Sequence, residues 1–186
     1  MTMLRRTLTR FVTQETGTLM AEAVLVLPFM LWSYLALFVY WDSFRAVNTV
    51  QKAAYTVSDM ISREMVSVTD GYIDGMDAMM EYLIDPDQDA TIRVSSITWS
   101  ALNNRYEVEW SRAPGNGMAQ LTTSSLVDLA PALPTLADGD FLVLVEAAVN
   151  YEPSFDVGMN DQTLREFIVT RPRFMPKICL VGVDCT

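Results

Sequence analysis

The chain has no histidine, only two cysteines, and 13 basic residues against 23 acidic ones. Histidine is the usual general base and a common metal ligand near neutral pH, so its absence removes the commonest kinds of catalytic and metal site. The acidic balance argues against nucleic acid as a partner, because nucleic-acid binding requires basic surface. Two thiols without histidine make a poor zinc site. We therefore expect no metal and no cofactor.

Several sequence motifs of catalysis and ligand binding are also missing. The chain contains no glycine-rich phosphate loop, no G-x-S-x-G and no C-x-x-C. Asp85-Pro-Asp87-Gln-Asp89 resembles the start of a calcium loop, but Ala90 stands where that loop needs glycine and Ser96 where it needs glutamate. A solvated loop between a helix and a strand is the favoured interpretation of these carboxylates.

Charge is absent from one long stretch, residues 23–41. Nineteen residues in a helix are enough to cross a bilayer core, which needs about 20. Tyr40 and Trp41 at its end suit a membrane interface. Pro28 lies inside the stretch and predicts a helix kink, which membrane spans tolerate. We therefore expect a transmembrane helix over residues 18–41.

The charges that flank this stretch predict its orientation. Arg5, Arg6 and Arg10 precede it with a single Glu15, and Asp42 follows it. The positive-inside rule places residues 1–22 in the cytoplasm and the rest across the membrane. An ordinary cleaved signal peptide is disfavoured, because its best cleavage site, Tyr34-Leu35-Ala36, has tyrosine where a small residue is needed. The sequence thus predicts a leader over 1–17 and an extracytoplasmic domain over 42–186.

Both cysteines, Cys179 and Cys185, lie in the predicted exported part. In an oxidising compartment such a pair normally forms a disulfide. We expect this disulfide to close a small loop and to clamp the C-terminal segment.

Helical periodicity continues beyond the apolar stretch. No glycine or proline occurs between Pro28 and Gly71, so we expect one helix over about 19–64, transmembrane first and amphipathic afterwards. A second helix is expected over 71–84, with an N-cap at Thr69-Asp70. The apolar positions expected on the inner faces of these two helices are Val47, Val50, Ala54, Val57, Ile61, Tyr72, Met76, Met79, Met80 and Leu83.

The remainder of the chain predicts strands. Residues 92–99 form a strand with a bulge near Ser95-Ser96, and residues 106–110 pair back as a hairpin after a turn at Asn103-Asn104. We expect an irregular connection over residues 118–140, with one helical turn at 124–129. A central strand buried on both faces is expected over residues 141–149, and the last strand over residues 165–170. The fold class is therefore α+β, with a long N-terminal helix and a second helix packed on an antiparallel sheet of about four strands.

One charged residue lies immediately before the apolar stretch. The segment Gly17-Thr-Leu-Met-Ala-Glu22-Ala-Val-Leu-Val-Leu-Pro28 follows a short basic leader. This pattern resembles the class III prepilin signal of type IV-like pilins, and in particular the opening of the TadE/TadF-like minor pseudopilins of tight-adherence (Flp-type) pili. The major pilins of that system are far shorter, so the likeness is to the minor class. The resemblance covers residues 1 to about 60.

This resemblance implies a pilin-like fold, a non-enzymatic role and a set of partners. A prepilin peptidase would cut between Gly17 and Thr18, which makes Glu22 the fifth residue of the mature chain. The other implied partners are the membrane, further pilins or pseudopilins and inner-membrane assembly platform proteins, with the C-terminal domain periplasmic or extracellular.

The physical chemistry of Glu22 is consistent with such a role. A carboxylate pulled to the middle of a bilayer costs up to about 3 kcal/mol, so a helix that leaves the lipid for a filament would need a cation beside it. The new amino group at Thr18 of a neighbouring subunit would supply that cation. The alternative interpretation is that Glu22 is a hydrated flank of a plain membrane anchor.

Two other classes of function remain open from the sequence. The chain would serve as a single-pass membrane-anchored scaffold or binding domain if it is never processed and enters no filament. An anchored enzyme is disfavoured by the missing motifs, although a carboxylate-based hydrolase needs only two carboxylates about 5–9 Å apart in a cleft.

Overall fold

A computed structural model describes the chain except for residues 1–17, 85–88, 116, 184 and 186. The chain divides into two compact units. One comprises the chain up to Asp42 together with Ser154–Met159. The other, the α+β unit, comprises Ser43–Pro153 and Asn160–Thr186.

Two α-helices precede the strands, as the periodicity predicts. Helix α2 spans Thr18–Ser62 and passes through Pro28 without interruption. Helix α3 spans Asp70–Leu83, and the hydroxyl of its N-cap Thr69 accepts a hydrogen bond from the backbone N–H of Tyr72 at 3.1 Å. That bond satisfies one of the free N–H groups at the helix start. The predicted bounds of both helices are correct to within two residues.

Four antiparallel strands form one sheet, and the predicted α+β class is confirmed. The strands are β1 (Ala90–Ser100), β2 (Arg105–Arg112), β3 (Phe141–Tyr151) and β4 (Gln162–Thr170), in the order β2-β1-β3-β4. The register of β1 against β2 shifts between Ser96 and Ile97, where the bulge is predicted. Asn104 adopts a φ of 49° in the hairpin turn, a conformation that asparagine tolerates better than most residues.

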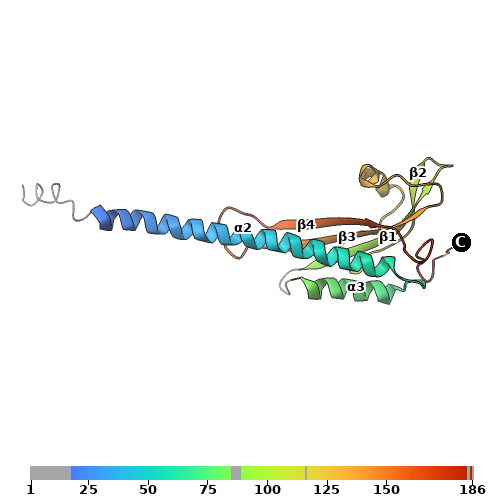
Figure 1. Ribbon diagram of the computed structural model, residues 1–186, viewed down its shortest axis with the longest axis horizontal. Helices are drawn as coiled ribbons and strands as arrows, with labels where there is room; N and C mark the ends of the chain where they lie inside the picture. The colour runs from blue at the N-terminus through green and yellow to red at the C-terminus, as the bar shows by residue number, and fades with distance from the viewer. Residues whose placement is uncertain (1–17, 85–88, 116, 184, 186) are drawn as a thin grey trace, which may run out of the picture. The chain divides into compact units, whose positions relative to one another are not determined.

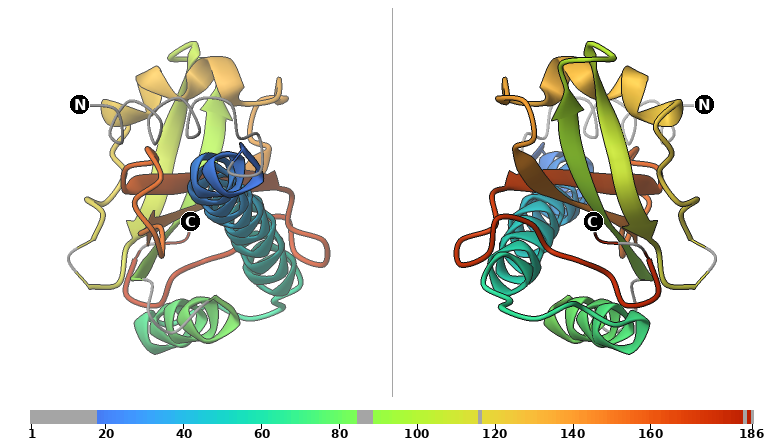
Figure 2. Two further views of the ribbon diagram at one scale, coloured as in Figure 1. Left: turned by 90° about the vertical axis from the view of Figure 1, so that its left-hand side faces the viewer. Right: turned by 90° about the vertical axis from the view of Figure 1, so that its right-hand side faces the viewer.

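One face of the sheet packs against the helices of the α+β unit. The core on this side joins the second half of α2, the inner face of α3 and alternate residues of β1 and β3. Figure 2 shows α3 (green) on the opposite side of the sheet from the 3-10 helices (gold). Val50, Ala54, Val57 and Ile61 are buried as predicted. The prediction for Leu83 is wrong: it is 39% exposed, and Ile73 is buried instead.

The other face of the sheet carries a second, smaller core. Two 3-10 helices, η2 (Ser125–Asp128) and η3 (Ala130–Ala132), belong to the irregular segment that supplies it. Its buried residues are Ile97, Leu121, Leu126, Leu133, Leu136, Leu142 and Leu144. Because β3 contributes odd-numbered residues to the first core and even-numbered residues to the second, it is buried on both faces, as its unbroken apolar run predicts.

Candidate functional site

The apolar segment of α2, residues 23–41, exposes most of its large side chains. Leu25 and Trp41 are each more than 70% exposed, whereas Val39 is buried. Proteins that act as isolated monomers in water rarely leave so large a continuous apolar surface uncovered. This segment therefore needs lipid or other helices around it.

The segment has the length that a bilayer requires. At about 1.5 Å per residue, its nineteen charge-free residues rise about 28 Å, close to the thickness of about 30 Å of a hydrocarbon core. Among the residues that the structure describes, one helix, α2, is both long enough and apolar enough to cross a membrane. Tyr40 and Trp41 are both exposed at its end, where aromatic side chains favour the lipid interface. Figure 1 shows α2 as one continuous helix, coloured from blue at its start to teal at its end.

Glu22 lies one helical turn after Thr18, the first residue of α2. Its side chain is exposed, and no ion pair joins it to any residue that the structure describes. Residues four apart lie on the same face of a helix, so the start of α2 and this carboxylate share one face. Gly17, on the other side of the predicted cleavage point, lies outside the described residues. A kink at Pro28 stays a prediction.

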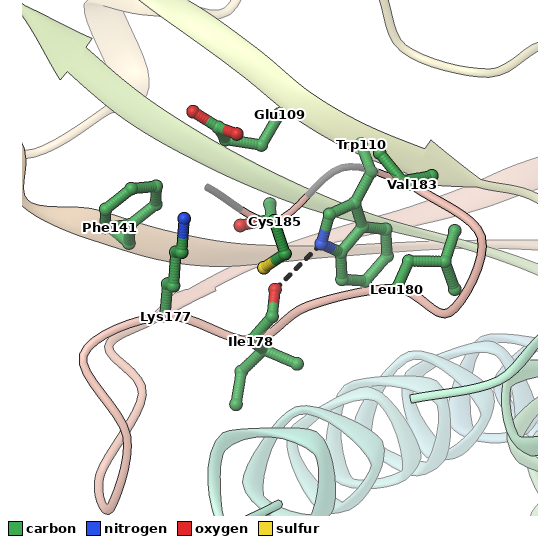
Figure 3. Close-up of a pocket in the computed structure, with 9 residues that line it drawn as sticks. Glu109, Trp110, Phe141, Lys177, Ile178, Leu180, Val183 and Cys185 are labelled. Atoms are coloured by element: carbon green, nitrogen blue, oxygen red, sulfur yellow. Dashed lines mark hydrogen bonds between the residues drawn. The ribbon is translucent and has the colours of Figure 1, made fainter. Parts of the chain in front are cut away.

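The two cysteines form the predicted disulfide, with their Cα atoms 5.8 Å apart. The C-terminal segment that carries it is tied to two distant parts of the chain. The backbone N–H of Val68 donates to the carbonyl of Cys179 at 2.8 Å, and the N–H of Val181 donates back to Val68 at 2.9 Å. The indole N–H of Trp110 donates to the carbonyl of Ile178 at 2.8 Å (Figure 3). We call this segment, with Ile178, Cys179, Val181 and Cys185, the C-terminal clamp. It holds β2 and the loop between α2 and α3 together.

The partners of this clamp are not evident in the sequence. Trp110 is 6% exposed, and its hydrogen bond joins it to a residue 68 positions further along the chain, which the alternation of its own strand cannot indicate. Trp99 packs across strands against Tyr106, with their ring centroids 4.8 Å apart.

The α+β unit also has a groove of about 720 Å³ on the sheet face away from α3. Arg93 and Glu146 lie in its lining and form a two-pronged ion pair, with nitrogen–oxygen distances of 2.6 and 2.7 Å. Arg93 also donates to the carbonyl of Ala119 at 2.6 Å. Because Arg93 binds both oxygens of Glu146, that carboxylate is poorly placed to act as a free base.

The suggested calcium loop falls partly outside the described residues. Asp85 and Asp87 are among the residues not described, and Asp89 lines the groove next to the start of β1. Over the residues that the structure does describe, no group of three or more histidine, cysteine or acidic side chains is arranged to hold a metal ion.

Two titratable groups of the α+β unit have raised pKa values. Burial is the main cause of the raised pKa of Asp77, opposed by a hydrogen bond that its carboxylate accepts from the N–H of Ile92 at 3.0 Å. Burial and a hydrogen bond with the Glu64 side chain raise the pKa of Tyr72. Asp77 links α3 to β1, and Tyr72 links α3 to the segment that follows α2, so both raised pKa values have a structural explanation.

Comparison of the chain with protein-family models, with curated proteins and with solved structures found no match.

Proposed function

We propose that the chain is a minor pseudopilin, a structural or assembly component of a tight-adherence (Flp-type) pilus. One observation carries the proposal: a single helix, α2, combines two different surfaces. Its first part is apolar, exposed and preceded by Glu22, and its second part belongs to the core of an α+β unit. A subunit that resides in a membrane and then joins a helical bundle needs both surfaces on one helix.

The two environments of such a subunit explain the charge at Glu22. In the bilayer, the carboxylate stays hydrated at the edge of the apolar segment, where its cost is small. In a bundle of neighbouring helices, water is excluded and the carboxylate needs a cation. Cleavage after Gly17 creates an amino group on Thr18, and the same group on a neighbouring subunit is the matching cation. Processing and the glutamate are thus parts of one mechanism.

The proposal includes a place in the cell. The N-terminus is cytoplasmic, residues 18–41 cross the bacterial inner membrane, and the α+β unit lies on the periplasmic or extracellular side. The disulfide supports this placement, because disulfides persist in oxidising compartments. The partners are a prepilin peptidase, other pilins or pseudopilins, and the proteins of the inner-membrane assembly platform.

The second candidate is a membrane-anchored scaffold that is not processed. The exposed residues of the apolar segment favour it equally, since any single-pass anchor presents such a surface to lipid. The two candidates differ at Gly17 and Glu22, which a plain anchor does not use.

The deciding experiment is the intact mass of the protein recovered from the membrane fraction of its own host. We expect the wild-type chain to have lost residues 1–17 and a Gly17→Leu variant to keep them. Gly75→Leu is the matched control, because Gly75 is exposed in α3 and a side chain there meets no neighbour within 4 Å. It should be processed like the wild type.

A second variant separates processing from assembly. Glu22→Gln has nearly the same shape but no charge, so we expect normal loss of residues 1–17 and a sharp fall in the amount recovered with sheared pili. Full-length mass in both the wild type and Gly17→Leu would refute processing and favour the anchored scaffold. Normal pilus recovery of Glu22→Gln would refute the proposed charge pairing.

A further inference from the structure

The connection between β3 and β4 contains the segment Ser154–Met159, which belongs to the same compact unit as the first part of α2. Phe155 in this segment is 46% exposed. Its ring meets that of Phe38 edge to face, with the centroids 6.1 Å apart. A segment far along the chain thus contacts the apolar segment of α2.

The point of contact lies near the end of the apolar segment. Phe38 precedes Trp41 by three residues, which is about 4.5 Å along a helix axis. If residues 23–41 cross the hydrocarbon core, the ring of Phe38 lies just inside its boundary. The ring of Phe155, in contact with it, then lies at the interface between hydrocarbon and headgroups, where aromatic side chains are favoured.

The local backbone makes a compact turn next to Phe155. The carboxylate of Asp156 accepts a hydrogen bond from the N–H of Gly158 at 3.3 Å, and Gly158 has a φ of +97°, which glycine adopts without strain. The turn therefore satisfies part of its own hydrogen bonding, which suits a segment that touches the polar headgroup layer. Val157 and Met159, both half-buried, are the other apolar residues of this segment.

Charge does not provide the attraction. Residues 152–161 contain three acidic side chains and no lysine or arginine. Segments that bind anionic lipid by charge need clustered basic residues. Any lipid contact of this segment must therefore be apolar, and anionic lipid should weaken it.

We propose that Ser154–Met159 is a second membrane-contacting segment, in which Phe155 enters the lipid interface beside Phe38. The inference rests on the proposed membrane placement of α2. It gives the chain a second contact with the bilayer surface, from a segment that lies far from α2 in the sequence.

The test is depth-dependent quenching of a fluorophore in the full-length oxidised chain. Because the native cysteines are paired with each other, a single introduced cysteine is the one thiol to be labelled. The label is placed at Ser154, and the chain is reconstituted in phosphatidylcholine vesicles that carry nitroxide lipids labelled either near the headgroup or deep in the acyl chain. Leu31→Cys, within the apolar segment, reports on insertion of α2. Leu102→Cys, 94% exposed in the β1–β2 turn, reports on water.

We expect the deep nitroxide to quench position 31, the headgroup nitroxide to quench position 154, and neither to quench position 102. Phe155→Ser should reduce the quenching at Ser154 to the level at Leu102. Phe174→Ser is the matched control, because Phe174 is also a half-exposed phenylalanine, at 59%, but lies outside the loop. It should leave the quenching at Ser154 unchanged, and replacing part of the phosphatidylcholine with phosphatidylglycerol should lower it.

The outcomes distinguish failure of the inference from failure of the proposed function. A label at Leu31 that the deep nitroxide does not quench would refute the membrane placement of α2 and with it both proposals. Quenching at Leu31 without quenching at Ser154 would refute the loop contact alone, and would assign Phe155 to a protein partner instead. Quenching at Ser154 that survives Phe155→Ser would also overturn the inference.

Discussion

Removal of the disulfide should destabilise the α+β unit by an amount that the structure allows us to estimate. Cys179 and Cys185 are 6 positions apart, so the bond closes a short loop. The loop-closure entropy removed from the unfolded chain then corresponds to about 2 kcal/mol at 25 °C. With a denaturant dependence of about 2 kcal/mol per molar urea, the unfolding midpoint should fall by about 1 M.

The hydrogen bonds of the C-terminal clamp add to the effect of the disulfide on stability. The carbonyls of Cys179 and Ile178 accept hydrogen bonds from Val68 and Trp110 respectively, so loss of the disulfide also loosens two packed contacts. The loss of about 2 kcal/mol counts the loop-closure entropy alone, so the measured loss of stability should be at least that large. Trp110 is buried in the folded unit, and its fluorescence should report the transition.

The assay is urea unfolding of the full-length chain in detergent micelles, followed by tryptophan fluorescence. The wild type is compared with the double variant Cys179→Ser/Cys185→Ser, each with and without a reducing agent. Reduction should bring the wild type to the midpoint of the variant and leave the variant unaffected. If the variant unfolds at the wild-type urea concentration, the clamp contributes nothing to stability and the reasoning is refuted.

Two further predictions concern the core and the pH dependence of the same unit. Ile61 is 1% exposed on the face of α2 that packs in the core, so Ile61→Ala should lower the free energy of unfolding by about 2–5 kcal/mol, measured in urea. Met60→Ala, at a neighbouring position that is 36% exposed, should lower it far less. Equal losses in the two variants would contradict the packing described. Burial raises the pKa of Asp77, so the native state binds a proton more tightly than the unfolded state and stability should fall as pH rises above about 4. Asp77→Asn keeps an oxygen that can accept from the N–H of Ile92 but cannot ionise, so its stability should not decline in this way. The variant should be more stable than the wild type at pH 7 and equally stable near pH 3. Parallel pH–stability curves would refute a raised pKa at Asp77.

The secondary structure was largely predictable because each element carries a strong local signal. The face formed by Val50, Ala54, Val57 and Ile61 repeats at helical spacing, and Thr69 has the hydroxyl that an N-cap requires. The unbroken apolar run of β3 can be satisfied only by cover on both faces, which places it inside the sheet. At α3, spacing alone did not fix the buried face: Ile73 rather than Leu83 is buried, because the position of the sheet decides which edge of an amphipathic face is covered.

In the candidate site too, some features follow from the sequence alone and others only from the tertiary structure. The sequence by itself determined the charge-free length of residues 23–41, the place of Glu22 before it and the pairing of the two cysteines, because chain composition and short separations fix these properties. Only the tertiary structure decided that Trp110 and Val68 hold the C-terminal clamp, that Arg93 neutralises Glu146, and that Phe155 meets Phe38. Each of these contacts joins residues far apart in the chain. Local periodicity carries no information about such pairs, and the packing of the folded chain selects them.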